Sequence, residues 1–245
     1  MTDIQIDIKN KTYTTADSRQ HTAIANLSLS LPTNKFICLV GPSGCGKTTL
    51  LNIIANLDQQ YQGEILLGQQ QLQPKIGYIF QSPRLLPWRT VRENIELVLT
   101  EQQSPKIIDS LLESMQLTDS QHAYPQHLSL GMSRRVAIIR AFAVNPHLLL
   151  MDEPFVSLDA PTARQVRNLL IHLWQQRPHT ILFVTHDLRE AIAMADRLVF
   201  LSAAPMSVIS EIEVTIPRIE RDNESAIEKF RQQLLTDHPK IKDLL

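Results

Sequence analysis

The stretch FICLVGPSGCGKTTLLNIIANL, residues 36–57, decides the fold that the sequence predicts. It begins with five apolar residues, 36–40, which are typical of a strand buried on both faces. A glycine-rich loop, GPSGCGKT (41–48), follows at once and matches the pattern G-x-x-x-x-G-K-[ST]. The residues after the loop have helical spacing. A strand, a glycine-rich turn and a helix in this order predict a phosphate-binding loop, with an ordinary turn as the alternative.

The loop has the chemistry to hold a nucleoside triphosphate. Its glycines let backbone N–H groups point at phosphate oxygens, and the start of the next helix adds positive potential. Lys47 can reach the β- and γ-phosphates, and the Thr48 hydroxyl can bind Mg²⁺. Cys45 occupies a variable loop position; a reactive thiol is the alternative, because a helix N-terminus lowers a thiol pKa. The candidate nucleotide contacts are Gly41, Pro42, Ser43, Gly44, Cys45, Gly46, Lys47, Thr48 and Thr49.

The composition indicates a soluble globular protein. Of the 245 residues, 43% are hydrophobic and 20% are charged, and 24 basic residues nearly balance 25 acidic ones. A net charge of −1 does not favour a nucleic-acid partner. Cys38 and Cys45 fall in a strand and a tight loop, a poor geometry for a disulfide, so we expect a reducing, cytosolic setting. Neither a signal peptide nor an apolar run of roughly 18–20 residues is recognisable.

The remaining pattern predicts one α/β domain. Apolar residues alternate with polar ones at 4–8 and 27–31, as in half-exposed strands. Helical patterns separate the later buried strands, which implies βα units and a mainly parallel sheet. These buried strands are expected at 76–80, 147–152, 180–186 and 197–202. We predict a core of 1–81 and 141–216, an inserted helical subdomain at 82–140, and a helical tail at 217–245 that packs on the core rather than regulating it.

A second chemical signal is HLLLMDEP, residues 147–154. This apolar strand ends in two carboxylates. Asp152 is placed to bind Mg²⁺, directly or through water, and Glu153 to orient and deprotonate an attacking water. Acidic residues often end strands, so the motif alone is weak. It becomes strong about a hundred residues after a phosphate-binding loop.

With these motifs the chain resembles the ATP-binding cassette (ABC) ATPases over nearly its whole length. The resemblance implies a P-loop NTPase core with a mainly parallel sheet, an N-terminal antiparallel β subdomain and an inserted α-helical subdomain. Tyr13 lies where the family has an aromatic residue that stacks on adenine, although a tyrosine that merely ends a strand is the alternative. Gln81 matches the glutamine that joins the Mg²⁺ shell and senses the γ-phosphate. His186, in FVTHD, matches the switch histidine that contacts the γ-phosphate.

The resemblance also assigns LSLGM (128–132) to the signature motif, in which Ser129 and the backbone near Gly131 contact a γ-phosphate. Leu130 departs from the usual LSGG; we predict a working variant whose leucine points away from the nucleotide. Asp159 belongs to a loop that crosses to a second subunit, and Val156 and Ser157 before it depart from the usual Ser-Ala or Gly-Ala. The family fold implies a head-to-tail dimer with two ATP between the subunits, closed by ATP binding and opened by hydrolysis.

A partner is indicated by SPRLLPWRTVRENI, residues 82–95. Leu85, Leu86 and Trp88 stand in a proline-flanked loop, where an exposed apolar patch typically binds another protein. The alternative is a loop folded onto its own helices. The family places the groove for a membrane subunit's coupling helix in this region, so we expect a permease in separate chains.

Three segments resemble the importer branch for nitrate, sulfonate and taurine. They are FQSPRLLPWRTVRENI, GM-x-RR and DEPFVSLDAPT. This implies uptake of such a solute, a periplasmic or surface solute-binding protein, and a peripheral position at the cytoplasmic face of the inner membrane. Three alternatives stay open: an exporter or lipid-transport ATPase with the same motifs, a soluble non-transport ABC ATPase, and a small-molecule kinase. The last would leave Gln81, the signature and His186 without a role.

Overall fold

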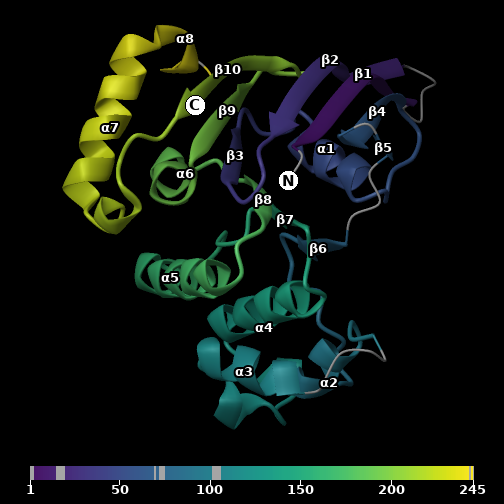
Figure 1. The fold of residues 1–245 in the computed structure, drawn as a ribbon, viewed down its shortest axis with the longest axis vertical. Coiled ribbons are helices and arrows are strands. Elements are labelled where there is room, and N and C mark those ends of the chain that lie inside the picture. Colours follow the sequence, from purple (N-terminus) through teal and green to yellow (C-terminus); the bar gives the residue numbers. More distant parts are fainter. Residues whose placement is uncertain are drawn as a thin grey trace. The chain divides into compact units, whose positions relative to one another are not determined.

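The structure is a computed structural model that describes residues 3–14, 20–68, 70–71, 75–100, 106–242 and 244 (Figure 1). The chain divides into two compact units. The first unit comprises residues 1–73 and 180–245, and the second comprises 74–179. Within the described ranges, no helix has both the length and the apolar character required to cross a membrane.

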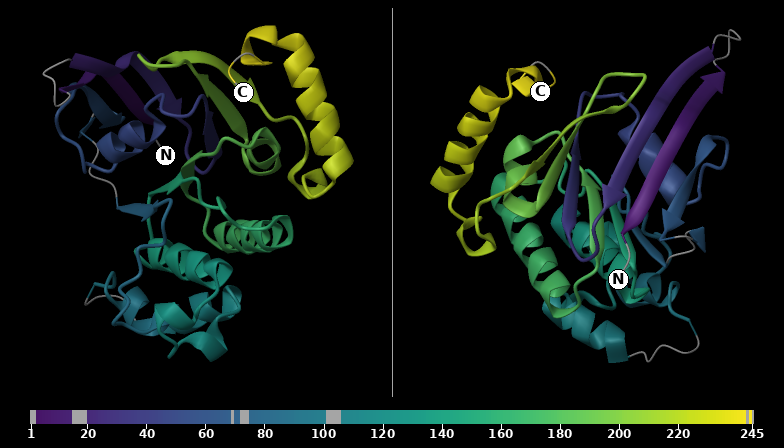
Figure 2. Two further views of the ribbon diagram at one scale, coloured as in Figure 1. Left: turned by 180° about the vertical axis from the view of Figure 1, so that it is seen from behind. Right: turned by 45° about the horizontal axis from the view of Figure 1, so that its top comes forward.

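The first unit contains an antiparallel sheet in the order β2-β1-β4-β5. The right view of Figure 2 shows its two long strands, β1 and β2, running side by side. Alternate residues of β1, starting at Ile4, are buried, as are Leu27, Leu29 and Leu31 of β2, which confirms the predicted alternation. The strands span Ile4–Thr14 (β1), Gln20–Leu31 (β2), Gln62–Leu67 (β4) and Gln70–Gln71 (β5).

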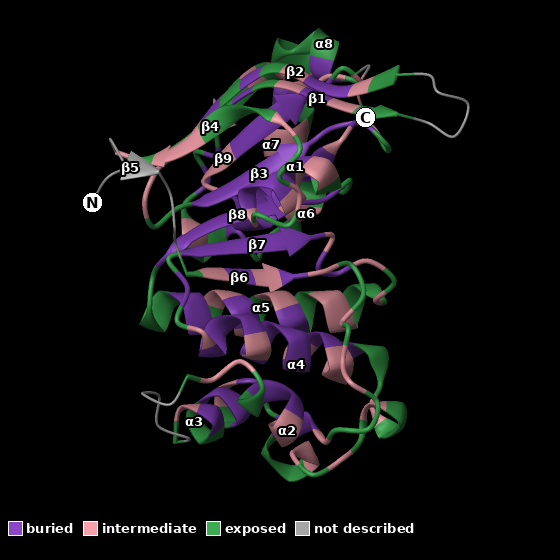
Figure 3. Ribbon diagram, turned by 90° about the vertical axis from the view of Figure 1, so that its right-hand side faces the viewer, coloured by how far each residue is buried: buried purple, intermediate pink, exposed green. Residues whose placement is uncertain are grey.

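The same unit holds the parallel strands that carry the phosphate-binding loop. β3 pairs in parallel with β8 on one side and β9 on the other, and β10 is antiparallel to β9. Every residue of β3 and β8 is buried, as predicted from their apolar runs (Figure 3). The elements are β3 (Phe36–Val40), α1 (Lys47–Ile54), β8 (Thr180–Val184), α6 (Leu188–Met194), β9 (Arg197–Leu201) and β10 (Val208–Glu213).

The C-terminal tail packs on this unit through α7 (Glu224–Asp237), which lies beside α6 in both views of Figure 2. Ile227 and Leu234 are the residues of α7 that are buried. Before α7, the buried guanidinium of Arg221 donates to four backbone carbonyls, including those of Met194 and Ala195 at the end of α6. The remaining elements are η3 (Arg218–Glu220) and α8 (Pro239–Lys242). The structure thus supports a tail helix that packs on the core.

The second unit combines two parallel strands with a helical region. β6 and β7 pair with Ile76 opposite Leu148, and α4 packs against α2, α3, α5 and β6. Gly77 allows this packing, because a Cβ there would lie 2.6 Å from the Ala141 carbonyl oxygen. The elements are β6 (Ile76–Ile79), α2 (Val91–Glu96), α3 (Lys106–Ser114), η1 (Thr118–Ser120), η2 (Pro125–His127), α4 (Leu130–Ala143), β7 (Leu148–Asp152) and α5 (Ala160–Gln176).

One strand differs from its prediction. The run IGYIF is expected to be buried, whereas in β6 only Gly77 and Ile79 are buried and Ile76 and Tyr78 are half-exposed. The Tyr78 ring stacks on Phe80 with the ring centroids 4.0 Å apart, and both Ile76 and Tyr78 stay partly accessible. The apolar run was a correct indication of a strand and a wrong indication of burial on both faces.

Candidate nucleotide-binding site

The phosphate-binding loop joins β3 to α1, as predicted. Gly44 and Gly46 have φ angles of 76° and 114°, in the left-handed region that favours glycine. Gly46 immediately precedes α1, so the backbone turns sharply into the helix. Lys47 is the first residue of α1 and Thr48 the second, which puts both side chains at the positive end of that helix.

The Lys47 ammonium is held close to the loop. Its side chain is buried, and Nζ donates to the carbonyl oxygens of Gly41 at 2.7 Å and Pro42 at 2.8 Å. The neighbouring Cys45 thiol is also buried, with Sγ 3.9 Å from Sδ of Met206. A buried thiol packed against a thioether supports the interpretation of Cys45 as a packing residue of the loop rather than a reactive one.

His186 and the phosphate-binding loop both follow the carboxyl ends of neighbouring strands. β3 and β8 are parallel neighbours with Leu39 opposite Val184, so the residues after each strand emerge together. His186 is exposed and lies two residues past the end of β8. The next residue, Asp187, caps α6 by accepting from the N–H groups of Arg189 and Glu190. A buried strand and a capped helix therefore fix the backbone on both sides of the histidine.

Tyr13 lies near the end of β1 and is 40% exposed. Its hydroxyl is 3.3 Å from Oγ1 of Thr49 and 3.2 Å from Oδ2 of Asp58. Thr49 belongs to α1, so the ring is tied to the helix that carries the phosphate-binding loop. Lys11 lies against the ring, with Nζ 4.5 Å from its centroid. Neither Lys11 nor Asp58 was among the residues predicted from the sequence.

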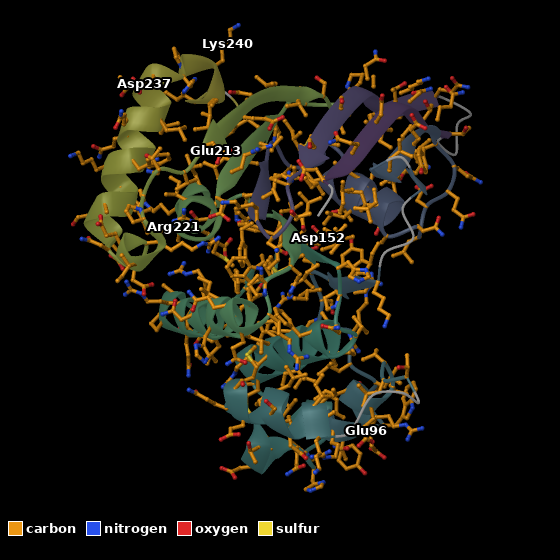
Figure 4. All side chains as sticks on the ribbon, viewed as in Figure 1. Glu96, Asp152, Glu213, Arg221, Asp237 and Lys240 are labelled. Atoms are coloured by element: carbon orange, nitrogen blue, oxygen red, sulfur yellow. The ribbon has the colours of Figure 1, made fainter. Side chains whose placement is uncertain are left out.

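In the second unit, β6 and β7 bring Gln81 and the two acidic residues together. The strands are parallel with Ile79 opposite Met151, and Gln81 Nε2 donates to Glu153 Oε2 at 3.5 Å. Asp152 is the last residue of β7 and is 6% exposed (Figure 4). Glu153 follows with a φ of 45°. A left-handed glutamate costs about 1–3 kcal/mol, and such strain gathers at functional sites.

The chain on either side of Gln81 is firmly anchored. Before it, the rings of Tyr78 and Phe80 are stacked; after it, the Arg84 guanidinium lies 3.8 Å from the Phe80 ring centroid. Arg140 of α4 donates to the carbonyls of Pro83 and Arg84. Burial and the charge of Asp152 raise the pKa of the Tyr78 phenol, which therefore stays neutral.

The signature residues stand at the start of α4. The Ser129 hydroxyl caps the helix by accepting from Met132 N–H at 3.2 Å. This uses a lone pair and leaves the O–H proton as a donor. Gly131 is buried, and a Cβ there would lie 2.7 Å from Cγ2 of Thr162. Leu130 has helical backbone and is 42% exposed, so its position does not require a glycine conformation.

The loop that contains Asp159 is tied to the signature helix. Asp159 caps α5, accepting from the N–H and the hydroxyl of Thr162, and that backbone N–H lowers the pKa of the carboxyl. Arg134 of α4 is 3% exposed and donates to the carbonyls of Val156 at 3.3 Å and Phe80 at 3.1 Å. Arg134 thus joins the signature helix to the residue before Gln81 and to the Asp159 loop. The sequence marked it only as part of the GM-x-RR pattern.

The predicted Mg²⁺ ligands have suitable chemistry. Thr48, Asp152 and Gln81 offer hydroxyl, carboxylate and amide oxygens, the donors that Mg²⁺ prefers. Across the described ranges, no three His, Cys, Asp or Glu side chains are grouped so as to hold a metal by themselves.

Comparisons with known proteins agree with this arrangement of motifs. The aliphatic sulfonates import ATP-binding protein of Bacillus subtilis (strain 168) is 39% identical over 248 residues, covering 98% of this chain and 96% of that protein. The nitrate import ATP-binding protein of Synechococcus elongatus is 37% identical over 246 residues, covering 96% of this chain and 89% of that protein.

Among solved structures, the dimeric structure of MJ0796, a bacterial ABC transporter cassette, superposes with a TM-score of 0.76. It is 30% identical in sequence, and the match covers 87% of this chain and all of that one. A post-hydrolysis state of the same cassette, bound to ADP and Pi, superposes with a TM-score of 0.75. These likenesses confirm the predicted ABC ATPase fold and ATP hydrolysis as the activity. Residues 24–156 match the model of the ABC transporter family, and the chain belongs to that family.

Proposed function

We propose that this chain is the ATP-hydrolysing subunit of an importer for a small solute of the nitrate, sulfonate or taurine kind. The observation that carries the proposal is the similarity, over nearly the whole chain, to two import ATP-binding proteins, one for aliphatic sulfonates and one for nitrate. The importer-like segments around Trp88 and Arg134 support it. The subunit would lie at the cytoplasmic face of the inner membrane, attached to a permease. A solute-binding protein would deliver the solute to that permease.

ATP binding rests on residues of the first unit. The loop N–H groups and the start of α1 attract the phosphates, and Lys47 neutralises part of their charge. Tyr13, tied to α1 through Thr49, offers its exposed ring to adenine. Base stacking of this kind is worth about 1–3 kcal/mol.

Hydrolysis needs a base and groups that sense the γ-phosphate. Glu153 accepts the proton of the attacking water, and Gln81, within hydrogen-bond reach of that carboxylate, orients the water. His186 donates to a γ-phosphate oxygen. Mg²⁺, when bound, neutralises phosphate charge, and Thr48, Asp152 and Gln81 would hold it.

The residues that the second unit exposes support a dimer. Ser129 and Asp159 are both exposed although each caps a helix, so their oxygen atoms are accessible from outside that unit. We infer that the signature of one subunit closes over ATP held by the phosphate-binding loop of another, head to tail. The dimeric cassette MJ0796 supports this assembly.

Lys47→Ala tests the nucleotide site. Removing the ammonium leaves phosphate charge unneutralised, so we expect Mg-ATP affinity to fall at least about tenfold, or 1.4 kcal/mol. Lys240→Ala, which removes an exposed lysine of α8, is the matched control and should bind as the parent does. Calorimetric titration measures both. Equal affinities for the two variants would contradict the assignment of the loop.

The proposed permease contact has a defined structure. Asn94 is fully buried and holds the loop from within: its Oδ1 accepts from Leu86 N–H at 2.7 Å, and its Nδ2 donates to the carbonyls of Leu86, Arg89 and Thr90. Trp88, inside this braced loop, is 69% exposed. Leu85 and Leu86 are half-buried. A loop braced in this way suits docking through its exposed tryptophan, since little backbone freedom is left to lose on binding.

We expect Leu86→Ser with Trp88→Ser to abolish assembly with the cognate permease while the isolated subunit stays folded and keeps its basal ATPase rate. Ile219→Ser, at a residue that is 91% exposed in the first unit, is the matched control and should leave assembly intact. Co-purification of the permease and thermal melting of the subunit provide the measurements. A collapse of the melting temperature would show that the two side chains are needed for folding and would refute the docking role.

A further inference from the structure

Lys11 is a buried lysine that none of the proposed steps uses. Only 2% of its side chain is exposed, and Nζ donates to Oδ1 of Asp58 at 2.7 Å and to the Gln60 carbonyl at 2.8 Å. Removing an ammonium from water is costly unless it is paired and hydrogen-bonded. Burial opposes ionisation of Asp58, yet hydrogen bonds from Lys11 and from Gln60 N–H outweigh it and hold the pKa of the carboxyl below its usual value. The pair is therefore charged and well defined.

Both members of this pair also touch Tyr13. Asp58 divides its oxygens, with Oδ1 on Lys11 and Oδ2 3.2 Å from the Tyr13 hydroxyl. Lys11 Nζ lies 4.5 Å from the centroid of the Tyr13 ring, so the ammonium sits against one face of the phenol. The hydroxyl also meets Thr49 at 3.3 Å. The ring is held at its tip and along one face, while the residue stays 40% exposed.

The pair affects both the position of the ring and its electrons. Thr49 lies two residues after Lys47, so the ring is fixed relative to the helix that receives the phosphates. The base and phosphates of one nucleotide are covalently joined, and a platform already at a fixed distance from the loop binds with less loss of freedom. The ammonium draws π density toward the covered face, which reduces repulsion between the opposite face and an electron-rich purine.

We infer that Lys11 and Asp58 are positioning residues for the nucleotide base: they hold Tyr13 as a one-sided platform, with Lys11 beneath it and the purine on the opposite face. This inference rests on the proposed function. It assigns a role in base binding to two residues that contact neither the phosphates nor the attacking water, so their effect should depend on whether the ligand carries a base.

The test compares two ligands on the full chain by calorimetric titration: Mg-ADP, which carries a base and is not hydrolysed, and Mg-pyrophosphate, which has no base. Lys11→Met with Asp58→Asn removes both charges together and leaves no unpaired buried charge. We expect this double variant to bind ADP about fivefold or more weakly, within the range of a lost stack, and to bind pyrophosphate within about twofold of the parent.

A mutant cycle then tests whether the effect passes through the ring. In a Tyr13→Ala background, the same two substitutions should cause no further loss of ADP affinity, because the platform is already gone. If they weaken ADP equally in both backgrounds, or weaken pyrophosphate as much as ADP, the pair merely supports the loop and the inference is overturned. Unchanged ADP affinity in the double variant overturns it too.

Tyr13→Phe keeps the test decisive if the double variant does not fold. It removes only the hydroxyl that meets Asp58 and Thr49, at an exposed residue. We expect at least about a twofold loss of ADP affinity with no change for pyrophosphate. If Tyr13→Phe binds ADP as tightly as the parent does, the inference that the hydroxyl contacts hold the ring in place is overturned. Failure of the proposed function looks different, because the parent itself would then bind neither ligand.

Discussion

Glu153→Gln is expected to lower the rate of ATP hydrolysis at least about a hundredfold while ATP stays bound. A glutamine amide has the size of the carboxylate but cannot accept the proton of the attacking water. Glu153 directly follows β7, with Gln81 Nε2 3.5 Å from its Oε2. The substitution keeps one oxygen for that contact. Binding and closure should therefore survive, and the step that opens the dimer should fail.

The measurements are phosphate release and light scattering with and without Mg-ATP. The Gln variant should accumulate as an ATP-stabilised dimer, whereas the parent returns to monomers as it hydrolyses ATP. Glu96→Gln neutralises an exposed glutamate at the end of α2 in the same unit and is the matched control (Figure 4). If Glu153→Gln hydrolyses ATP at the parent rate, the assignment of the base is wrong. Loss of ATP binding would instead indicate a structural role.

The parts of the site that could be predicted from the sequence are those set by local pattern. Five apolar residues before a glycine-rich loop leave little choice other than a buried strand and a turn, and β3 and the loop follow that prediction. Because β8 pairs in parallel with β3, the residues that follow β8 lie beside the phosphate-binding loop, which is why the position of His186 could be anticipated. The tail predicted at 217–245 to be helical and to pack on the core likewise forms α7, in which Ile227 and Leu234 are buried.

The parts that could not be predicted depend on irregular backbone and on partners distant in sequence. Strict alternation along β1 would turn Lys11 outward, but the pairing of β1 with β4 is irregular between Ile8 and Asn10, and Lys11 is buried. The partner of Lys11, Asp58, is 47 residues away. Arg134 binds two backbone carbonyls, and carbonyls carry no sequence signal. The left-handed conformation of Glu153 is equally invisible in an Asp-Glu pair.

The second large effect is expected at Gly131. Gly131→Asp should reduce ATP hydrolysis by more than about a hundredfold, roughly 2.7 kcal/mol of barrier, because it sets a carboxylate against phosphate and a Cβ against Thr162. The steric part is separable. A Cβ at this position would lie 2.7 Å from Thr162 Cγ2, and Thr162 is stiff at χ1 and fixed to Asp159 through its hydroxyl. Gly131→Ala should therefore already cost about tenfold.

Thr162→Ser removes that methyl group and keeps the hydroxyl that binds Asp159. Combined with Gly131→Ala, it should restore most of the lost rate, and Thr162→Ser alone measures what the methyl contributes by itself. Steady-state ATPase assays on the four proteins complete the cycle. If Gly131→Ala is as slow in the Thr162→Ser background as beside the native threonine, the glycine is needed for the approach of the nucleotide rather than for the fit between α4 and α5.

Leu130 then decides what kind of signature this is. Its backbone is helical and its side chain is 42% exposed, whereas Gly131 is buried, so the tight position is the second of the pair. Leu130→Gly should change the ATPase rate by less than about tenfold, since it removes a largely exposed side chain and leaves the Ser129 cap in place. A larger gain would show that the natural leucine impairs the site. The expected contrast between two neighbouring residues, one tolerant and one not, follows from the Thr162 methyl group, which leaves no room for a Cβ at position 131.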